Sequence, residues 1–180
     1  MQRNVSIGIA AAISCALSGS ALGQSRSSFA DGSLSDVTLL ITNGGLNYNV
    51  AVGGMPTVTV ANQTFPIIDV FGFWALSDDD DLTVSNSSFG VWVVSNNNSG
   101  TGGIAGWDSN PNSGLFVNQS EQFNFTSLNV ASVESYGYHV RIDGIFPGTQ
   151  GNTGFVNVPS PAGAALFGMG GVLAWRRRRR

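Results

Sequence analysis

The sequence contains no lysine, and its 180 residues include one cysteine and one histidine. The cysteine, Cys15, lies in the first 23 residues, so residues 24–157 have no disulfide, no thiol nucleophile and no cysteine metal ligand. Without lysine, Schiff-base chemistry and Lys–Asn isopeptide cross-links are excluded. The single histidine, His139, has no nucleophile-elbow motif to act with. We therefore predict that the protein has no catalytic residues and is not an enzyme.

Positive charge is scarce in residues 24–157. Arg26 and Arg141 stand against eleven Asp and Glu residues, which gives this part a net charge of −9. The balance disfavours nucleic acid and anionic membrane surfaces as partners, because both carry negative charge themselves. It is typical of a soluble exported protein that stays dispersed in an external matrix.

Sustained helical periodicity is also missing from residues 24–157. Short alternating runs between turn residues instead predict an all-β fold, a single antiparallel β-sandwich of jelly-roll type with about nine strands. The runs with this pattern are residues 36–42, 46–52, 57–61, 65–76, 82–85, 89–95, 115–118, 122–127, 128–133 and 136–143.

Glycine and asparagine mark the expected connections. Asn43-Gly44-Gly45 predicts a hairpin turn, and Gly53-Gly54 predicts another between residues 46–52 and 57–61. The low-complexity segment 95–103 predicts an exposed loop. Residues 147–153 are interpreted as a flexible neck that follows the β domain.

The end of the sequence combines three parts in order. Val158, Pro159, Ser160 and Pro161 form a short proline motif, residues 162–175 carry no charge, and the basic cluster is Arg176, Arg177, Arg178, Arg179 and Arg180. The uncharged stretch can enter a bilayer as a short transmembrane helix, whereas the arginines stop transfer and stay on the cytoplasmic face. As a helix this stretch spans roughly 21 Å against roughly 30 Å of hydrocarbon, which suits a temporary hold better than a permanent one.

This tail resembles the PEP-CTERM sorting signal of exported bacterial proteins, with Ser160 where the family name has glutamate. The resemblance implies that an exosortase, a membrane-embedded processing enzyme, cuts near residues 158–161 and releases or transfers the protein. It therefore implies a membrane-anchored precursor and, after processing, a place in the cell envelope or outside the cell. A permanent C-terminal anchor is the alternative interpretation.

The first 23 residues predict a secretory signal peptide. Arg3 supplies the positive n-region, residues 5–17 are mostly apolar, and Ala21-Leu22-Gly23 places small residues where signal peptidase cuts. Cleavage before Gln24 is expected, with cleavage after Ser20 as the alternative. The domain prediction is thus a signal peptide (1–23), a β domain (24–157) and a sorting signal (158–180).

Two segments are candidate calcium sites, and calcium is the one candidate cofactor. Asp78 and Asp80 belong to a run of four aspartates, and clustered carboxylates attract calcium. Asp108, Asn110 and Asn112 place oxygen side chains at alternate positions, as in the start of an EF-hand loop. Solvated turns explain the same residues.

Trp107, Tyr136 and Tyr138 are candidates for a sugar-stacking platform, because flat aromatic faces match sugar rings. Trp107, between Gly106 and Asp108, is expected to be exposed. Trp74 and Trp92 lie in the most hydrophobic runs and are expected in the core. Extracellular polysaccharide is therefore a candidate partner.

Together these patterns favour an exported bacterial surface or extracellular-matrix protein with a structural or adhesive role, processed at its C-terminal signal. The alternative is a carbohydrate-binding module assisted by calcium.

Overall fold

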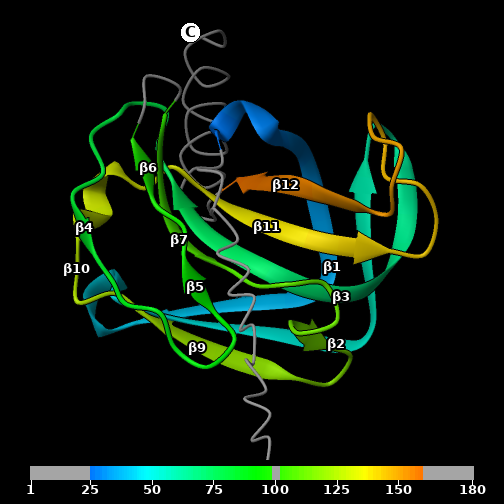
Figure 1. The fold of residues 1–180 in the computed structure, drawn as a ribbon, viewed down its shortest axis with the longest axis horizontal. Helices are drawn as coiled ribbons and strands as arrows, with labels where there is room; N and C mark the ends of the chain where they lie inside the picture. Colours follow the sequence, from blue (N-terminus) through cyan, green and yellow to red (C-terminus); the bar gives the residue numbers. More distant parts are fainter. Residues whose placement is uncertain (1–24, 99–101, 160–180) are drawn as a thin grey trace, which may run out of the picture.

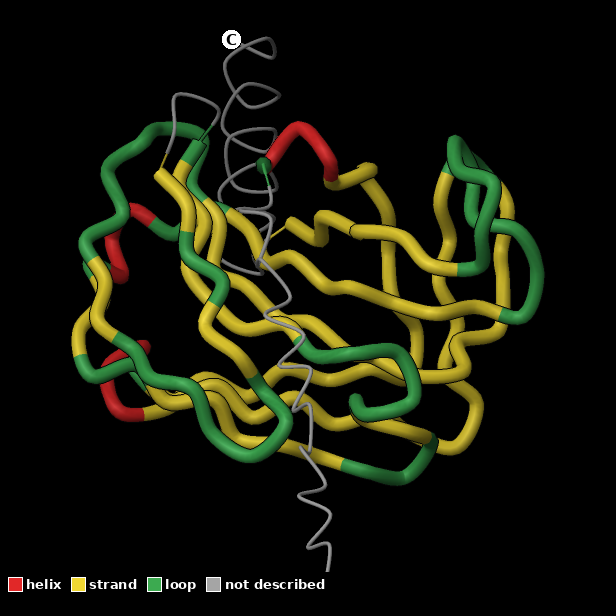
Figure 2. The backbone as a smooth tube through the Cα atoms, viewed as in Figure 1, coloured by secondary structure: helices red, strands yellow, loops and turns green. Residues whose placement is uncertain are grey.

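The computed structural model describes residues 25–98 and 102–159, and most of these residues lie in strands (Figure 2). The predicted signal peptide, Ser160, Pro161, the apolar stretch and the arginine cluster lie outside the described residues. The longer strands are β1 (Phe29–Thr42), β2 (Asn47–Val60), β3 (Gln63–Leu76), β7 (Gly103–Asp108), β9 (Ser120–Asn124), β11 (Ser135–Ile142) and β12 (Thr153–Pro159). The two-residue strands are β4 (Val84–Ser85), β5 (Val93–Val94), β6 (Asn97–Asn98), β8 (Leu115–Phe116) and β10 (Ser127–Leu128).

Helical structure in the described part of the chain is limited to single 3-10 turns. They are η1 (Arg26–Ser28), η2 (Asn43–Gly45) and η3 (Val130–Ser132). Within residues 25–98 and 102–159, no helix has the length and apolar character needed to cross a membrane. The prediction of an all-β fold is confirmed.

The strands form two layers, as in a sandwich (Figure 1). One layer contains β12, β11, β3 and β7, and the other contains β1, β2 and β9. β1 and β3 belong to both layers, because β1 pairs first with β12 and then with β2, while β3 pairs first with β2 and then with β11. The pairings therefore form a closed circuit, β3–β11–β12–β1–β2–β3.

The predicted purely antiparallel pairing is wrong at one place. The start of β1 pairs in parallel with β12, with Phe29 opposite Phe155 and Asp31 opposite Asn157. The two strands are far apart in the sequence, so their connection can run in either direction, whereas neighbouring strands joined by tight turns must be antiparallel.

The turn predicted at Asn43-Gly44-Gly45 is confirmed as η2 between β1 and β2. All three residues have positive φ, of 53°, 64° and 91°. Glycine is needed at Gly45 for a second reason, since a Cβ there would lie 2.6 Å from the Val130 side chain. The turn chemistry thus fixes the register of the hairpin.

The turn predicted at Gly53-Gly54 is wrong, because β2 continues through both residues. The register shifts here, because residues 53–56 of β2 lie opposite the single residue Asp36 of β1, which has a φ of 58°. The Asp36 carboxylate accepts the Met55 N–H at 2.7 Å and fills the space where a Cβ on Gly53 would clash. The glycines therefore make room for a side chain on the neighbouring strand.

β3 confirms the central strand predicted at residues 65–76, with a bulge in place of the expected break. His139 lies opposite Gly72 and Val140 lies opposite Val70, so Phe71 is the extra residue. Both faces of the strand are buried here, since Phe73 points into the main core while Trp74 belongs to a second cluster with Leu76 and Ile104.

Aromatic side chains fill the space between the layers. The Phe123 ring lies 5.2 Å from Phe73, 5.3 Å from Trp107 and 4.8 Å from Trp92, measured between ring centres. Trp74 and Trp92 are buried, as predicted. Burial of such large rings accounts for a stable domain without a disulfide.

The flexible neck predicted at residues 147–153 is wrong. This segment is a hydrogen-bonded loop between β11 and β12, in which the Phe146 N–H donates to the Gly151 oxygen at 2.8 Å. β12 then enters the sheet between β11 and β1, and Val156 is fully buried. The last strand is therefore an inner strand, although the turn residues at 147–153 suggested that the β domain ends before it.

Candidate functional site

The proline motif begins inside the sheet. Val158 lies opposite Tyr136 and Pro159 lies opposite Ser135, as the last two paired positions between β12 and β11. Val158 is half-buried, whereas Pro159 is exposed. The predicted boundary after residue 157 therefore falls two residues before the end of the last strand.

Several polar groups surround the point where β12 ends. Ser135 lies opposite Leu76 on one side and Pro159 on the other, and the acidic run follows Leu76 directly. We call this region the exit edge and define it as Leu76, Ser77, Asp78, Glu134, Ser135 and Pro159.

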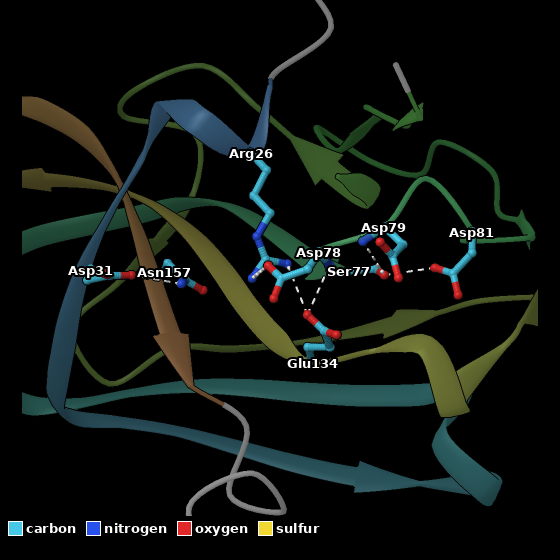
Figure 3. Close-up of polar contacts among 8 residues, drawn as sticks. All are labelled: Arg26, Asp31, Ser77, Asp78, Asp79, Asp81, Glu134 and Asn157. Carbon is cyan, nitrogen blue, oxygen red and sulfur yellow. Dashed lines mark hydrogen bonds and ion pairs between the residues drawn. The ribbon is translucent and has the colours of Figure 1, made fainter. Parts of the chain in front are cut away.

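Arg26 joins η1 to the exit edge (Figure 3). Its guanidinium group forms an ion pair with Asp78, and its Nη1 lies 3.9 Å from Glu134 Oε2. The side chain is mostly buried, and its Cδ would lie 2.8 Å from a Cβ on Gly102. One of the two arginines of the domain thus binds the start of the described chain to the end of β3 and the start of β11.

The two carboxyl groups beside Arg26 interact with each other. The Asp78 N–H donates to Glu134 Oε2 at 2.9 Å. A hydrogen bond with the Asp78 carboxyl, followed by burial, raises the pKa of Glu134 above its usual range. Two carboxylates held this close favour one retained proton, although the Arg26 charge opposes that effect.

The rest of the acidic run is held in place by short hydrogen bonds. The Ser77 hydroxyl donates to Asp81 Oδ1 at 2.7 Å, and the Asp79 N–H donates to Ser77 Oγ at 3.2 Å (Figure 3). Hydrogen bonds from Ser132 and then Ser77 hold the pKa of Asp81 below its usual range. Asn129 Nδ2 also donates to the Asp81 carbonyl at 2.6 Å. The run is an ordered turn with internal partners.

Three buried polar atoms near the exit edge have no hydrogen-bond partner among the described residues. They are Ser135 Oγ, Asn157 Oδ1 and Arg26 Nη1. The other end of the Asn157 amide is satisfied, because its Nδ2 donates to Asp31 Oδ1 at 3.0 Å (Figure 3). An unsatisfied buried polar group costs about 1–3 kcal/mol, so a partner that bonds to these atoms gains that energy.

The predicted calcium residues lie on two separate loops. Asp78 and Asp80 follow β3, whereas Asp108 ends β7 and Asn110 and Asn112 follow it. Asp78 is paired with Arg26, and Asp108 Oδ1 lies 3.2 Å from His139 Nδ1. Among residues 25–98 and 102–159, no group of three or more His, Cys, Asp or Glu side chains is placed to hold a metal ion. The two predicted calcium segments therefore remain separate, and each stays a prediction.

The predicted sugar-stacking platform is wrong, because all three aromatic residues are buried. Trp107 is 0% exposed, and its Nε1–H donates to the Ser87 carbonyl at 2.9 Å. Tyr136 and Tyr138 point into the main core beside Phe73, and burial raises the pKa of Tyr138 above its usual range. Gly106 and Asp108 suggested a loop around Trp107, but this segment is strand β7, in the layer that also contains β3, β11 and β12.

His139 lies in an aromatic stack. Its ring centre is 3.8 Å from that of Phe71 and 3.9 Å from that of Phe155, and Asp108 is its acidic partner. This arrangement holds the imidazole in place within the sheet.

Asp69 and Arg141 form the second ion pair of the sheet. Asp69 is fully buried and accepts three hydrogen bonds, from Arg141 Nε at 2.9 Å, Arg141 Nη2 at 3.3 Å and the Asn112 N–H at 2.8 Å. A buried carboxylate needs such a complete set of donors. The pair connects β3, β11 and the loop after β7.

Sequence reasoning missed the part played by Arg26 and the pairing of Val158 and Pro159. The signal for Arg26 was its isolation, since a lone arginine in a strongly acidic domain must find carboxylates. The signal for β12 was the alternation of Phe155 and Asn157 with Val156 and Val158, which continues up to the proline motif.

We compared the chain with protein-family models, with curated proteins and with solved structures, and none of these three comparisons gives a match.

Proposed function

We propose that this is an exported bacterial protein of the cell envelope or extracellular matrix, processed at its C-terminal sorting signal. In this proposal signal peptidase removes residues 1–23, the apolar stretch 162–175 holds the precursor in the membrane, and an exosortase-type enzyme cuts near residues 158–161. The β domain then acts without catalysis, in a structural or adhesive role.

The observation that carries the proposal is the position of Pro159 at the last paired position of β12. A cut directly after it removes no strand from the sheet. A cut a few residues earlier would remove part of an inner strand and expose the core around Val156. The motif therefore stands at the first point where the tail can leave without loss of the fold.

The exit edge supports the same proposal. Pro159 is exposed, and the buried Ser135 Oγ beside it has no partner among the described residues. Because Pro159 itself is exposed, a processing enzyme can reach the motif at this position. The ion pairs of Arg26 hold the surrounding loop in place while the enzyme binds.

Cell fractionation with an antibody against the β domain tests the proposal. We expect the wild-type protein at reduced size in the envelope or medium, and at precursor size in cells that lack the exosortase. Replacement of all five arginines, Arg176–Arg180, by serine should also leave the precursor unprocessed. An identical size and distribution of the protein in all three samples would refute the proposal.

A further inference from the structure

The layer formed by β1, β2 and β9 carries a regular grid of uncharged side chains on its outer face. β1, β2 and β9 lie side by side there (Figure 1). Residues 47–52 of β2 pair without a register shift with residues 37–42 of β1, and residues 47–51 pair in the same way with β9. Three rows cross the strands, Thr38–Ala51–Ser120, Leu40–Asn49–Gln122 and Thr42–Asn47–Asn124. We call these nine residues the amide face.

The amide face is open to solvent. Six of its residues, those on β1 and β9, are exposed, and the three on β2 between them are half-buried. Leu40 in the central row is 63% exposed. Strands lie about 4.8 Å apart and alternate side chains about 6.7 Å apart, so the nine side chains form a flat surface.

The face carries no charge, in a domain with a strongly negative balance. Asp78 and Glu134 are at the exit edge, the other aspartates of the acidic run follow Asp78, and Asp69 is in the buried pair with Arg141. Asp36, which precedes the face on β1, has its carboxylate bonded to the Met55 N–H. Exposed protein surfaces ordinarily carry Lys, Arg, Asp and Glu in about a quarter to a third of positions, but charged residues are only 11% of this chain, so the face offers a partner hydrogen-bonding groups and no ion pairs.

The chemistry of the face fits hydroxyl groups. A carboxamide both donates and accepts hydrogen bonds, as each sugar hydroxyl does, and Thr and Ser hydroxyls share this property. Gln122 Nε2 donates to Asn124 Oδ1 at 2.9 Å, which fixes the two amides relative to each other. Each still has donor and acceptor capacity beyond that bond. Leu40 beside them offers an apolar contact for the C–H groups of a sugar ring.

We infer that the amide face binds a neutral polysaccharide, which would give the proposed matrix protein its adhesive partner. An anionic polymer is disfavoured, because the domain itself is acidic and the face offers no arginine. The inference extends the proposed function, but the binding itself requires only the folded sheet and not the processing of the C-terminal signal.

The test measures retention of the protein, recovered from its own cells with its termini defined, on immobilised polysaccharides. The neutral probes are amorphous cellulose, chitin and mannan, and alginate is the anionic probe. We expect retention on at least one neutral probe and none on alginate. Absence of binding to all three neutral probes, or equal binding to alginate, would overturn the inference.

Two variants locate the binding surface. Leu40→Glu places a charge in the central row and should abolish retention, whereas Ile145→Glu, at a similarly exposed loop residue (67%), should leave it unchanged. Gln122→Ala removes up to two hydrogen bonds and should weaken binding about 2- to 10-fold per bond. Equal retention of Leu40→Glu and the wild type would contradict the assignment.

The amide face could instead bind a second copy of the chain. Light scattering on the same samples measures the mass of the protein in solution and so detects such a dimer. A dimer that Leu40→Glu dissociates, without any polysaccharide retention in the wild type, would overturn the inference in favour of self-association. The termini of the recovered protein report separately on the sorting proposal, so failure of one proposal does not imply failure of the other.

Discussion

Pro159 lies opposite Ser135 in the register between β12 and β11, so the proline motif starts within the folded sheet. In the proposed processing, this relationship determines how much of the chain an exosortase-type enzyme can remove without disrupting the sheet. The inner position of β12, between β11 and β1, makes its residues part of the domain. The functional boundary of the domain is therefore Pro159.

Truncation tests this boundary. A chain of residues 24–159 should unfold cooperatively, whereas a chain of residues 24–151 should fail to fold, because it lacks β12 and the buried Val156. Circular dichroism during thermal unfolding distinguishes the two. A chain ending at residue 161 is the control and should match the one ending at 159. Cooperative unfolding of the 24–151 chain would show that β12 is dispensable.

The buried ion pair should be the more sensitive of the two arginine sites. Arg141→Met leaves the fully buried Asp69 carboxylate without its main donor and should cost about 3–5 kcal/mol in the free energy of unfolding. Arg26→Met should cost about 1 kcal/mol or less, because Asp78 is 69% exposed. Urea unfolding measures both. The double variant Asp69→Asn with Arg141→Met should regain part of the loss, and equal losses for the two single variants would contradict this account.

Two carboxyl groups, Glu134 beside the acidic run and Asp81 within it, should give opposite pH dependences. The pKa of Glu134 is raised in the folded state, so its contribution to stability is complete below about pH 4.5 and is lost as pH rises. The stability of the wild type relative to Glu134→Gln should therefore fall between pH 4 and pH 7.

Asp81 provides the matched comparison. Its folded pKa is lowered, so its contribution is present above the usual aspartate pKa and is lost as pH falls through the folded value. The stability of the wild type relative to Asp81→Asn should rise over the lower part of the same pH series. Slopes of equal sign for the two variants would show that the hydrogen bonds of this turn are assigned wrongly.

The turn between β2 and β3 contains a residue in an unfavourable conformation. Ala61 and Asn62 have φ values of 51° and 62°, as a two-residue hairpin of type I′ requires. Ala61→Gly should raise the free energy of unfolding by about 0.5–1 kcal/mol, because glycine adopts positive φ without a steric cost. Ala131→Gly, in η3, is the control and should not stabilise the protein. A lower melting temperature for Ala61→Gly would contradict the strain at this turn.

The elements that sequence could predict are those determined by local chemistry. Alternation and turn residues predicted the all-β fold, the turn at Asn43 and the central strand at residues 65–76. Hydrophobic context placed Trp74 and Trp92 in the core. Each of these depends on neighbours within a few positions in the chain.

Most of the failures involve contacts between distant segments, and the missed strand β12 is the exception, because its alternation is local. Gly53 accommodates the Asp36 carboxylate of another strand, which sequence spacing does not reveal. Trp107 follows a glycine, but it is buried by Phe123 and Phe125 from a later strand. The amide face became visible only when the register aligned alternate residues of three strands. The sequence shows the alternation within each strand, but it does not show which strands lie next to each other.

The most direct test of the central claim is the intact mass of the protein from its own cells, with both termini mapped by peptide sequencing. The account predicts a chain that begins near Gln24 and ends between Pro159 and Ala162, with a complete β12. A chain that still contains Trp175 and the arginines, or one cut before Val158, would contradict it.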